Sequence, residues 1–239
     1  MKGEVTNTVP QLSIIVPCLD EAAGIVAALR RLQPLRGRGH EVIVVDGGSS
    51  DETAALAAPY ADRVVVAPRG RAAQMNAGAA LACEGVLLFL HADCTLPAQA
   101  DHLILDGLTA SGKKWGRFDI SLDGAHPLLP VIAFMMNMRS QVTGIATGDQ
   151  GIFVARDLFA AVAGYPPLPL MEDIALSRRL RASGRPLRVR SQITASARRW
   201  QRHGVLRTVM LMWRLRLAYF LGADPAGLAL RYDAARPRD

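Results

Sequence analysis

The stretch VVDGGSSDE at residues 44–52 turns an apolar run abruptly into a cluster of carboxylates, and the stretch LLFLHAD at residues 87–93 does the same. Each apolar run has the length and composition of a strand that is buried on both faces. In an open parallel sheet, the ligand crevice lies outside the carboxyl ends of the strands. Charged side chains placed there stay hydrated and can reach a ligand. We therefore expect an α/β fold with a binding site where these two strands end.

The first 110 residues alternate between strand-like and helix-like segments. Strands are predicted at residues 12–16, 42–45, 64–67 and 86–90, and helices at 21–32, 51–58 and 72–83. Ser49, followed three residues later by Glu52, forms a capping box for the second of these helices. Repeated strand–helix units joined by right-handed crossovers build a mostly parallel sheet with helices on both faces.

The regular alternation ends near residue 110. Residues 115–122 alternate as a strand does at an exposed edge or in a mixed sheet, and residues 151–155 resemble another strand. Helices are predicted at 128–141, 171–181 and 205–221, the last of them amphipathic. No linker, repeat or low-complexity segment is evident, so we expect one domain over residues 1–239.

Composition narrows the function classes. The chain has 239 residues and a formal net charge of +7. Arginine supplies nearly all of the positive charge and is concentrated after Arg178, which indicates either an anionic partner or a solvated basic face. The three cysteines lack CxxC spacing, and neither a signal peptide nor a membrane-spanning run is evident. These features predict a cytoplasmic protein, with peripheral contact to the inner face of an anionic membrane left open.

Two motifs near the strand ends also suit ligand binding. Asp20 and Glu21 follow Pro17 at the start of a helix, where an ordinary N-cap would use the same residues. The basic stretch RGRAAQMNAG at residues 69–78 opens the next helix and could bind an anion, although its spacing is not that of a P-loop.

Two acidic motifs suit metal binding and proton transfer. His91 and Asp93 project to the same side of an extended segment and suit Mn²⁺ or Mg²⁺, with positions left for phosphate oxygens. Glu172 and Asp173 open a helix after a proline-rich loop, where a carboxylate could serve either as a general base or as a helix cap.

The order of these motifs resembles that of family-2 glycosyltransferases, whose GT-A fold is a single-domain α/β fold. The resemblance covers about residues 12–202 and also includes TGDQG at 147–151, MEDIAL at 171–176 and RRW at 198–200. It implies a mostly parallel central sheet flanked by helices. A nucleotide-binding half would span about residues 12–110, a mixed-sheet acceptor and catalytic half about 111–202, and C-terminal helices 203–239. The chain is similar to small bacterial members of sugar-containing natural-product pathways, including a group associated with arsenosugar biosynthesis.

The resemblance also implies roles for individual residues. It places a nucleotide-diphosphate sugar donor against Pro17, Leu19, Glu21, Asp46, Ser49, Asp51, Arg71, Asn76 and Ala92. It places a divalent metal on Asp93 and His91, with His91 standing where the family usually has an Asp. It makes Asp173 the base, with Glu172 as the second catalytic carboxylate. The acceptor side takes Asp149, Gln150, Arg199 and Trp200. Ser196 replaces the Gln of processive relatives, which argues against polymer synthesis.

We therefore predict an inverting, metal-dependent glycosyltransferase that moves a sugar to an acceptor hydroxyl, with inversion implied by the family. One alternative is a nucleotidyltransferase, which would want a glycine-rich basic signature where PCLDE stands at residues 17–21. The other is a non-catalytic basic module for membrane or nucleic acid. Few aromatic residues and no helix-turn-helix or zinc pattern weaken the nucleic-acid version, so no nucleic-acid partner is expected.

Overall fold

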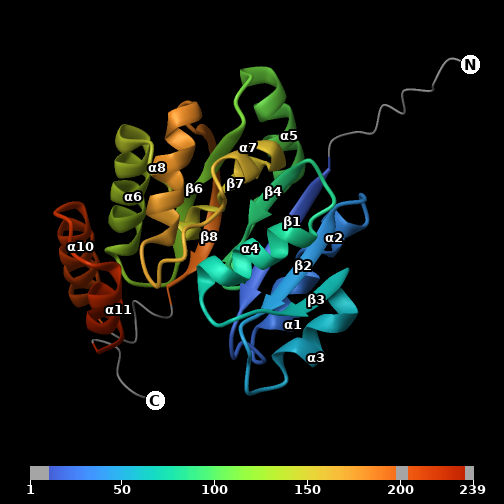
Figure 1. Cartoon of the computed structure of the whole chain (residues 1–239), viewed down its shortest axis with the longest axis horizontal. Coiled ribbons are helices and arrows are strands. Elements are labelled where there is room, and N and C mark those ends of the chain that lie inside the picture. Colours follow the sequence, from blue (N-terminus) through green and yellow to red (C-terminus); the bar gives the residue numbers. More distant parts are fainter. Residues whose placement is uncertain (1–10, 198–203, 235–239) are drawn as a thin grey trace, which may run out of the picture.

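The computed structural model describes residues 11–197 and 204–234, which form an eight-stranded sheet flanked by helices (Figure 1). The order across the sheet is β3-β2-β1-β4-β7-β6-β8-β5. Strands β1 to β4 are mutually parallel, whereas β7 is antiparallel to both of its neighbours. The strands are β1 (Leu12–Cys18), β2 (Glu41–Asp46), β3 (Arg63–Val66), β4 (Val86–Phe89), β5 (Cys94–Thr95), β6 (Trp115–Asp123), β7 (Phe153–Ala155) and β8 (Leu187–Ser196).

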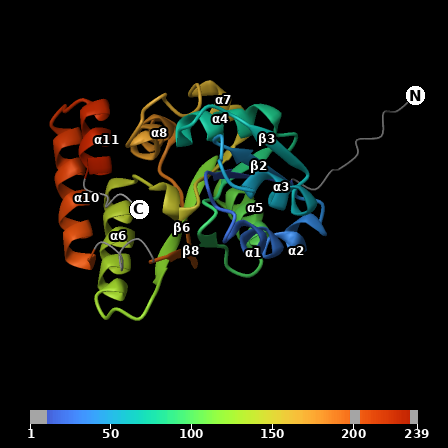
Figure 2. The ribbon, with the colours of Figure 1, turned by 90° about the horizontal axis from the view of Figure 1, so that it is seen from below.

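Helices cover both faces of this sheet, and a further pair lies at one end of the molecule (Figure 1 and Figure 2). The helices are α1 (Ile25–Arg30), α2 (Gln33–Arg36), α3 (Thr53–Ala57), α4 (Arg71–Leu81), α5 (Ala100–Ser111), α6 (Leu129–Thr143), α7 (Arg156–Ala161), α8 (Glu172–Leu180), α10 (Val205–Phe220) and α11 (Pro225–Ala234). Short 3₁₀ turns occur at Ala58–Tyr60, Gly148–Gln150 and Arg181–Ser183. The α/β class and the helix-flanked, mostly parallel sheet predicted from the sequence are confirmed.

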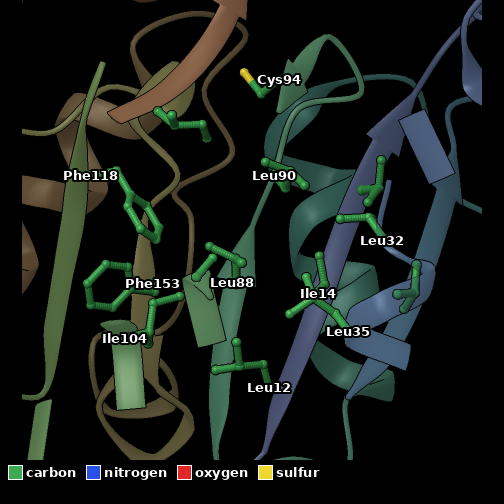
Figure 3. Packing of buried hydrophobic residues seen from close by; sticks show 14 of the residues in the cluster. Leu12, Ile14, Leu32, Leu35, Leu88, Leu90, Cys94, Ile104, Phe118 and Phe153 are labelled. Carbon is green, nitrogen blue, oxygen red and sulfur yellow. The ribbon is translucent and has the colours of Figure 1, made fainter. Parts of the chain in front are cut away.

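The alternation of side chains along β1 divides the core into two layers. Leu12 and Ile14 join one hydrophobic cluster with α1, α2 and α5 (Figure 3), whereas Ile15 faces the cluster formed with α4, α7 and α8. All seven residues of β1 are buried, as a strand covered on both faces requires. Burial on both faces holds β1, β2 and β4 in place, so their carboxyl ends lie in fixed positions next to one another.

Gly78 sets how closely α4 lies on the sheet. A Cβ at this position would come within 2.5 Å of Ile15 Cγ2 and 3.0 Å of Val45 Cγ2. Helix α4 therefore packs directly against β1 and β2. Its N-terminus at Arg71 lies toward the carboxyl ends of the strands, since crossover helices run antiparallel to a parallel sheet.

Several predicted elements differ in the structure. The predicted capping box of Ser49 and Glu52 is wrong: α3 begins at Thr53, and the Ser49 hydroxyl donates to Asp46 instead. The helix predicted at residues 21–32 is divided into a turn and α1, with α2 following. By contrast, residues 115–122 form β6 inside the mixed sheet, between β7 and β8, which is one of the two placements that the sequence predicted. The sequence interpretation missed β5, β8, α5 and α7, whereas α10 and α11 lie where C-terminal helices were expected.

Helices α10 and α11 pack together at the end of the molecule that also carries α6 (Figure 2). Leu215 and Leu228 form a small hydrophobic cluster there with Met171 and Ile174, which connects this helix pair to the start of α8. Among the helices that the structure describes, none combines the length and the apolarity needed to cross a bilayer.

Candidate functional site

A cavity of about 760 Å³ opens where β4 ends, between the start of α8 and the helices α6 and α10. Six residues singled out in the sequence line it, although they come from distant parts of the chain: Arg71, His91, Asp93, Asp149, Glu172 and Asp173. Its volume lies in the range of about 300–1,000 Å³ that is usual for small-molecule sites. The parallel sheet therefore brings the basic motif and three acidic motifs to a single site.

The end of β4 provides a group of possible metal ligands. One ligand atom each of His91, Asp93 and Cys94 lies within 4.8 Å of the others. Burial, together with nearby Asp93, raises the pKa of Cys94 well above that of an ordinary thiol, and its Sγ lies 3.8 Å from an Asp93 carboxylate oxygen. Cys94 is therefore a neutral thiol donor. The imidazole and carboxylate that remain suit Mn²⁺ or Mg²⁺ and leave coordination positions for phosphate oxygens.

His91 is held in place by the loop before β7. A Cβ on Gly148 would come within 2.5 Å of His91 Nε2, so only glycine allows the loop to pack this closely on the imidazole ring. The adjacent Asp149 carbonyl oxygen lies 4.0 Å from Cys94 Sγ on the other side. The loop therefore positions the candidate metal ligands.

Asp173 is fixed at the start of α8. Its Oδ2 accepts a hydrogen bond from the Gly148 backbone N–H at 2.9 Å, and its Oδ1 accepts one from the Ile174 N–H at 2.7 Å. Met171, the residue before α8, has the left-handed backbone conformation (φ +68°) that turns the chain into the helix. Asp173 is a partly exposed carboxylate with a set orientation, facing a cavity.

Glu172 lies in a different environment from its neighbour, because its side chain is buried. Burial, and then the charge of Asp173, raise its pKa to about 7, and attraction to Arg71 offsets part of this rise. The two adjacent carboxyl groups therefore differ in kind: Glu172 is enclosed and titrates near neutrality, whereas Asp173 is open to the cavity.

Arg71 at the first position of α4 is the cation that faces these carboxylates. Enclosure lowers its pKa, but attraction from Glu172, Tyr232, Asp173 and Asp93 outweighs this effect and holds the pKa above its ordinary value. The positive end of the α4 dipole lies at the same place. An anion close to Asp93 would meet both positive charges.

The loops that follow β1 and β2 lie together outside this cavity. Asp20 N–H donates to Ser49 Oγ at 2.9 Å, and Ala22 N–H donates to Asp51 at 3.0 Å. Asp46 accepts hydrogen bonds from the backbone N–H groups of Gly48 and Ser49. These carboxylates thus shape the paired loops. Pro17 is buried and pairs with β2, whereas Leu19, Glu21 and Ala92 are partly exposed.

Two predicted site residues serve the scaffold. The Asn76 side-chain amide donates to the Tyr165 carbonyl oxygen and accepts from the Tyr165 N–H, so it connects α4 to the segment after α7. Gln150 is fully buried, and its Oε1 accepts from the Thr147 N–H at 3.2 Å. The predicted acceptor residues Arg199 and Trp200 lie outside the described residues.

The sequence interpretation missed other residues of the cavity: Arg139 of α6, Gly148, and Arg216 and Tyr232 of the last two helices. Gly148 lies in the quoted TGDQG motif, so its proximity to Asp149 was a usable signal. Arg139, Arg216 and Tyr232 carry no local signal, because only the packing of α6, α10 and α11 brings them to the cavity.

The raised pKa of Glu172 has a consequence for stability. A carboxyl that is protonated more readily in the folded state stabilises it below about pH 4.5, and this contribution is lost as the pH rises toward about 7. The free energy of unfolding of the wild type should therefore fall, relative to that of Glu172→Gln, by up to about 3 kcal/mol over this interval. Urea unfolding of both proteins from pH 4.5 to 8 measures the difference, and parallel pH profiles would contradict the assignment.

Solved structures share this architecture. A mannosyltransferase from Pyrobaculum calidifontis, in complex with GDP-Man and Mn²⁺, superposes with a TM-score of 0.63 at 17% identity, covering 97% of this chain and 66% of that one. TarS residues 1–349 of S. aureus, in complex with UDP-GlcNAc, superpose with a TM-score of 0.65 at 16% identity, covering 79% of this chain and 59% of that one. The fold is therefore that of GT-A glycosyltransferases, as predicted.

Sequence comparison provides the family. An uncharacterised glycosyltransferase of Mycobacterium bovis is 32% identical over 88 residues, which is 36% of this chain and 38% of that protein. The match thus spans well under half the length of that relative. The family model described as glycosyl transferase family 2 matches residues 13–156, more than half of the chain. On this match the chain belongs to glycosyl transferase family 2, as its motifs predicted.

Proposed function

We propose that this chain is an inverting, metal-dependent glycosyltransferase that uses a nucleotide-diphosphate sugar donor and an acceptor hydroxyl. The observation that carries the proposal is the convergence of Asp93, Arg71 and Asp173 on one cavity at the carboxyl edge of the sheet. Family membership favours sugar transfer over the nucleotidyltransferase and binding-module alternatives. A neighbour in fold that binds GDP-Man and Mn²⁺ supports the donor class and the metal.

Each group would have a defined part in the reaction. Asp93 and His91 would hold a divalent cation, which would supply Lewis acidity toward the leaving diphosphate. Arg71 and the N-terminus of α4 stabilise the negative charge that develops there. Asp173 takes the proton of the acceptor hydroxyl as its oxygen bonds to the anomeric carbon. The bond to the diphosphate breaks with its electron pair, and attack from the opposite face inverts the configuration.

The test is a thermal-shift series with UDP and GDP, each with and without Mn²⁺. A ligand that binds only the folded state raises the melting temperature by mass action. We expect one nucleotide to stabilise the protein in a Mn²⁺-dependent manner. If neither nucleotide shifts the transition under any metal condition, the proposed donor class is wrong.

We further propose that α6 and α10 rest on an anionic membrane surface. Thirteen large hydrophobic side chains are exposed among the described residues, and all of them except Val66 belong to α6, α10, Leu221 or α11. Exposed apolar surface is therefore concentrated at the end of the molecule that these helices form. On α10 the exposed side chains recur every three or four residues and form one stripe: Leu206, Met210, Trp213, Leu217 and Phe220.

The charge of this surface agrees with a lipid partner. Neither α6 nor α10 contains an acidic residue, and Arg207 and Arg214 are exposed on α10. An apolar stripe with a tryptophan, flanked by arginines, is the arrangement of helices that lie in the interface of anionic bilayers. The opposite side of α10 packs through Leu215, so core packing occupies only one side of the helix.

Membrane contact predicts a selective loss of vesicle binding. Replacing Met210 and Leu217 with Gln should weaken binding to phosphatidylglycerol vesicles by about tenfold or more, because two apolar side chains no longer enter the bilayer. Co-sedimentation at low and high salt measures this. Val66→Gln is the control, since Val66 is also exposed (73%, against 61% for Met210 and Leu217) but lies on β3, away from this surface. Absence of binding at low salt would reject the proposal, and salt-sensitive self-association in its place would identify a second copy as the partner.

A further inference from the structure

The part of the cavity that lies between α6 and α10 has mostly apolar walls. Ile132 and Met135 of α6 line one side, and Met212, Leu217 and Phe220 of α10 line the facing side. Met135, Leu217 and Phe220 are exposed to solvent, so a hydrocarbon chain that covers them would remove apolar surface from water, whereas a free sugar would gain much less from this contact. Walls of this kind suit a hydrocarbon chain.

Two arginines interrupt the apolar lining. Arg139 of α6 and Arg216 of α10 each have a buried Nε–H that lacks a hydrogen-bond partner. Within residues 11–197 and 204–234, neither guanidinium forms an ion pair, and the only hydrogen bond recorded for their side chains is a long one, 3.4 Å, from Arg139 to Thr147. Burial, and then the charge of Arg216, lower the pKa of Arg139 to about 10. Asp149 and Asp173 attract Arg139 as well, and an anion bound between the two guanidinium groups would reduce their repulsion and accept from both Nε–H groups.

This arginine pair is separate from the donor-side cation. Arg71 interacts with Glu172, Tyr232, Asp173 and Asp93, whereas the charged neighbours of Arg139 are Arg216, Asp149, Asp173 and Arg117. Asp173 is the one carboxylate common to both sets. It therefore lies between a cation next to the candidate metal ligands and a cation pair next to the apolar walls.

We propose that the acceptor is an amphiphile: its hydrocarbon portion lies between α6 and α10, and its anionic group is bound by Arg139 and Arg216. Its reacting hydroxyl then lies beside Asp173. This inference rests on the proposed sugar transfer and specifies the acceptor class for the same site. It shares Leu217 and Phe220 of α10 with the proposed membrane contact, and a monomeric ligand tests the cavity without a bilayer.

The test is calorimetric titration of the full chain with decyl phosphate below its micelle concentration, compared with inorganic phosphate and with decanol. Decyl phosphate should bind at least about tenfold more tightly than either, since only it uses both the walls and the arginines. Arg139→Ala and Arg216→Ala should each weaken it by about 10- to 100-fold, the range for a lost hydrogen bond to a charged group. Arg31→Ala, an exposed arginine of the opposite half, should leave its affinity unchanged.

A second pair of variants tests the apolar wall. Met135→Gln changes a lining residue of α6, whereas Val142→Gln changes an exposed residue of the same helix that does not line the cavity. Only the first should weaken decyl phosphate binding. Equal affinity for inorganic phosphate would overturn the role of the walls, and equal affinity for decanol would overturn the anion site.

Nucleotide binding measured in the same variants distinguishes failure of the amphiphile site from failure of the proposed donor class. If Arg139→Ala and Arg216→Ala weaken Mn²⁺-dependent binding of the nucleoside diphosphate instead, the arginines belong to the donor site and the inference is wrong. If the wild type binds decyl phosphate as described but neither UDP nor GDP, the proposed donor class fails while the amphiphile site remains.

Discussion

Asp173→Asn is expected to slow sugar transfer by about 10²–10⁴-fold, the usual contribution of a positioned general base, while binding of the donor stays nearly unchanged. The carboxylate faces the cavity and is oriented by the N–H groups of Gly148 and Ile174. Asn preserves the shape of the side chain and removes its basicity. Release of the nucleoside diphosphate during transfer measures the rate, and a titration with the nucleoside diphosphate and Mn²⁺ measures the binding.

Glu172→Gln is the matched control for this variant, because the two carboxyl groups are adjacent but differ in exposure. We expect a smaller loss, since Glu172 is buried and titrates near neutrality. If Glu172 were the base, the wild-type rate would rise as the pH passes through about 7 and Glu172→Gln would abolish transfer. That result, with Asp173→Asn near the wild-type rate, would reverse the assignment. If neither variant matters, Asp149 is the next carboxylate to test.

Asp93→Ala is expected to abolish the Mn²⁺-dependent part of nucleotide binding. At a free nucleotide concentration of about 100 times the Kd, binding adds roughly 2.7 kcal/mol to the free energy of unfolding. For a chain of this size, this corresponds to a rise of about 5–10 °C in the melting temperature. The wild type should show this shift with Mn²⁺ and the variant should not. The physical reason is that the carboxylate next to His91 is the main hard ligand at the end of β4.

Asp106→Ala controls for the change in net charge, since Asp106 is an exposed carboxylate on α5 and does not line the cavity. It should bind the nucleotide and Mn²⁺ as the wild type does. A folded Asp93→Ala protein that keeps its full Mn²⁺-dependent shift would exclude Asp93 as a metal ligand and leave His91 without its expected partner.

The sequence alone determined the half of the fold that local patterns control. The runs at residues 12–16, 42–45, 64–67 and 86–90 became β1 to β4. Strands β1, β2 and β4 are buried on both faces and must be apolar throughout, whereas β3 lies at the edge of the sheet and is partly exposed. By contrast, β8 was missed: its polar and apolar residues are mixed, and its pairing with β6 is interrupted by an irregularity after Phe118. The capping prediction for Ser49 failed because its Oγ accepts from the Asp20 N–H on the neighbouring loop, and α3 begins only at Thr53.

The residues of the candidate site also form two groups: those that local motifs identify and those that only tertiary packing brings together. Asp93, Asp149 and Asp173 belong to short motifs whose order resembles that of a family, so the sequence could single them out, and the sheet then brings them to one cavity. Asn76 belongs to such a motif as well, but its amide holds the backbone of Tyr165, a partner that no local pattern reveals. Arg139 and Arg216 come from helices far apart in the chain. Only tertiary packing places their charges together, because the interaction of two side chains depends on their distance in space and not on their separation in sequence.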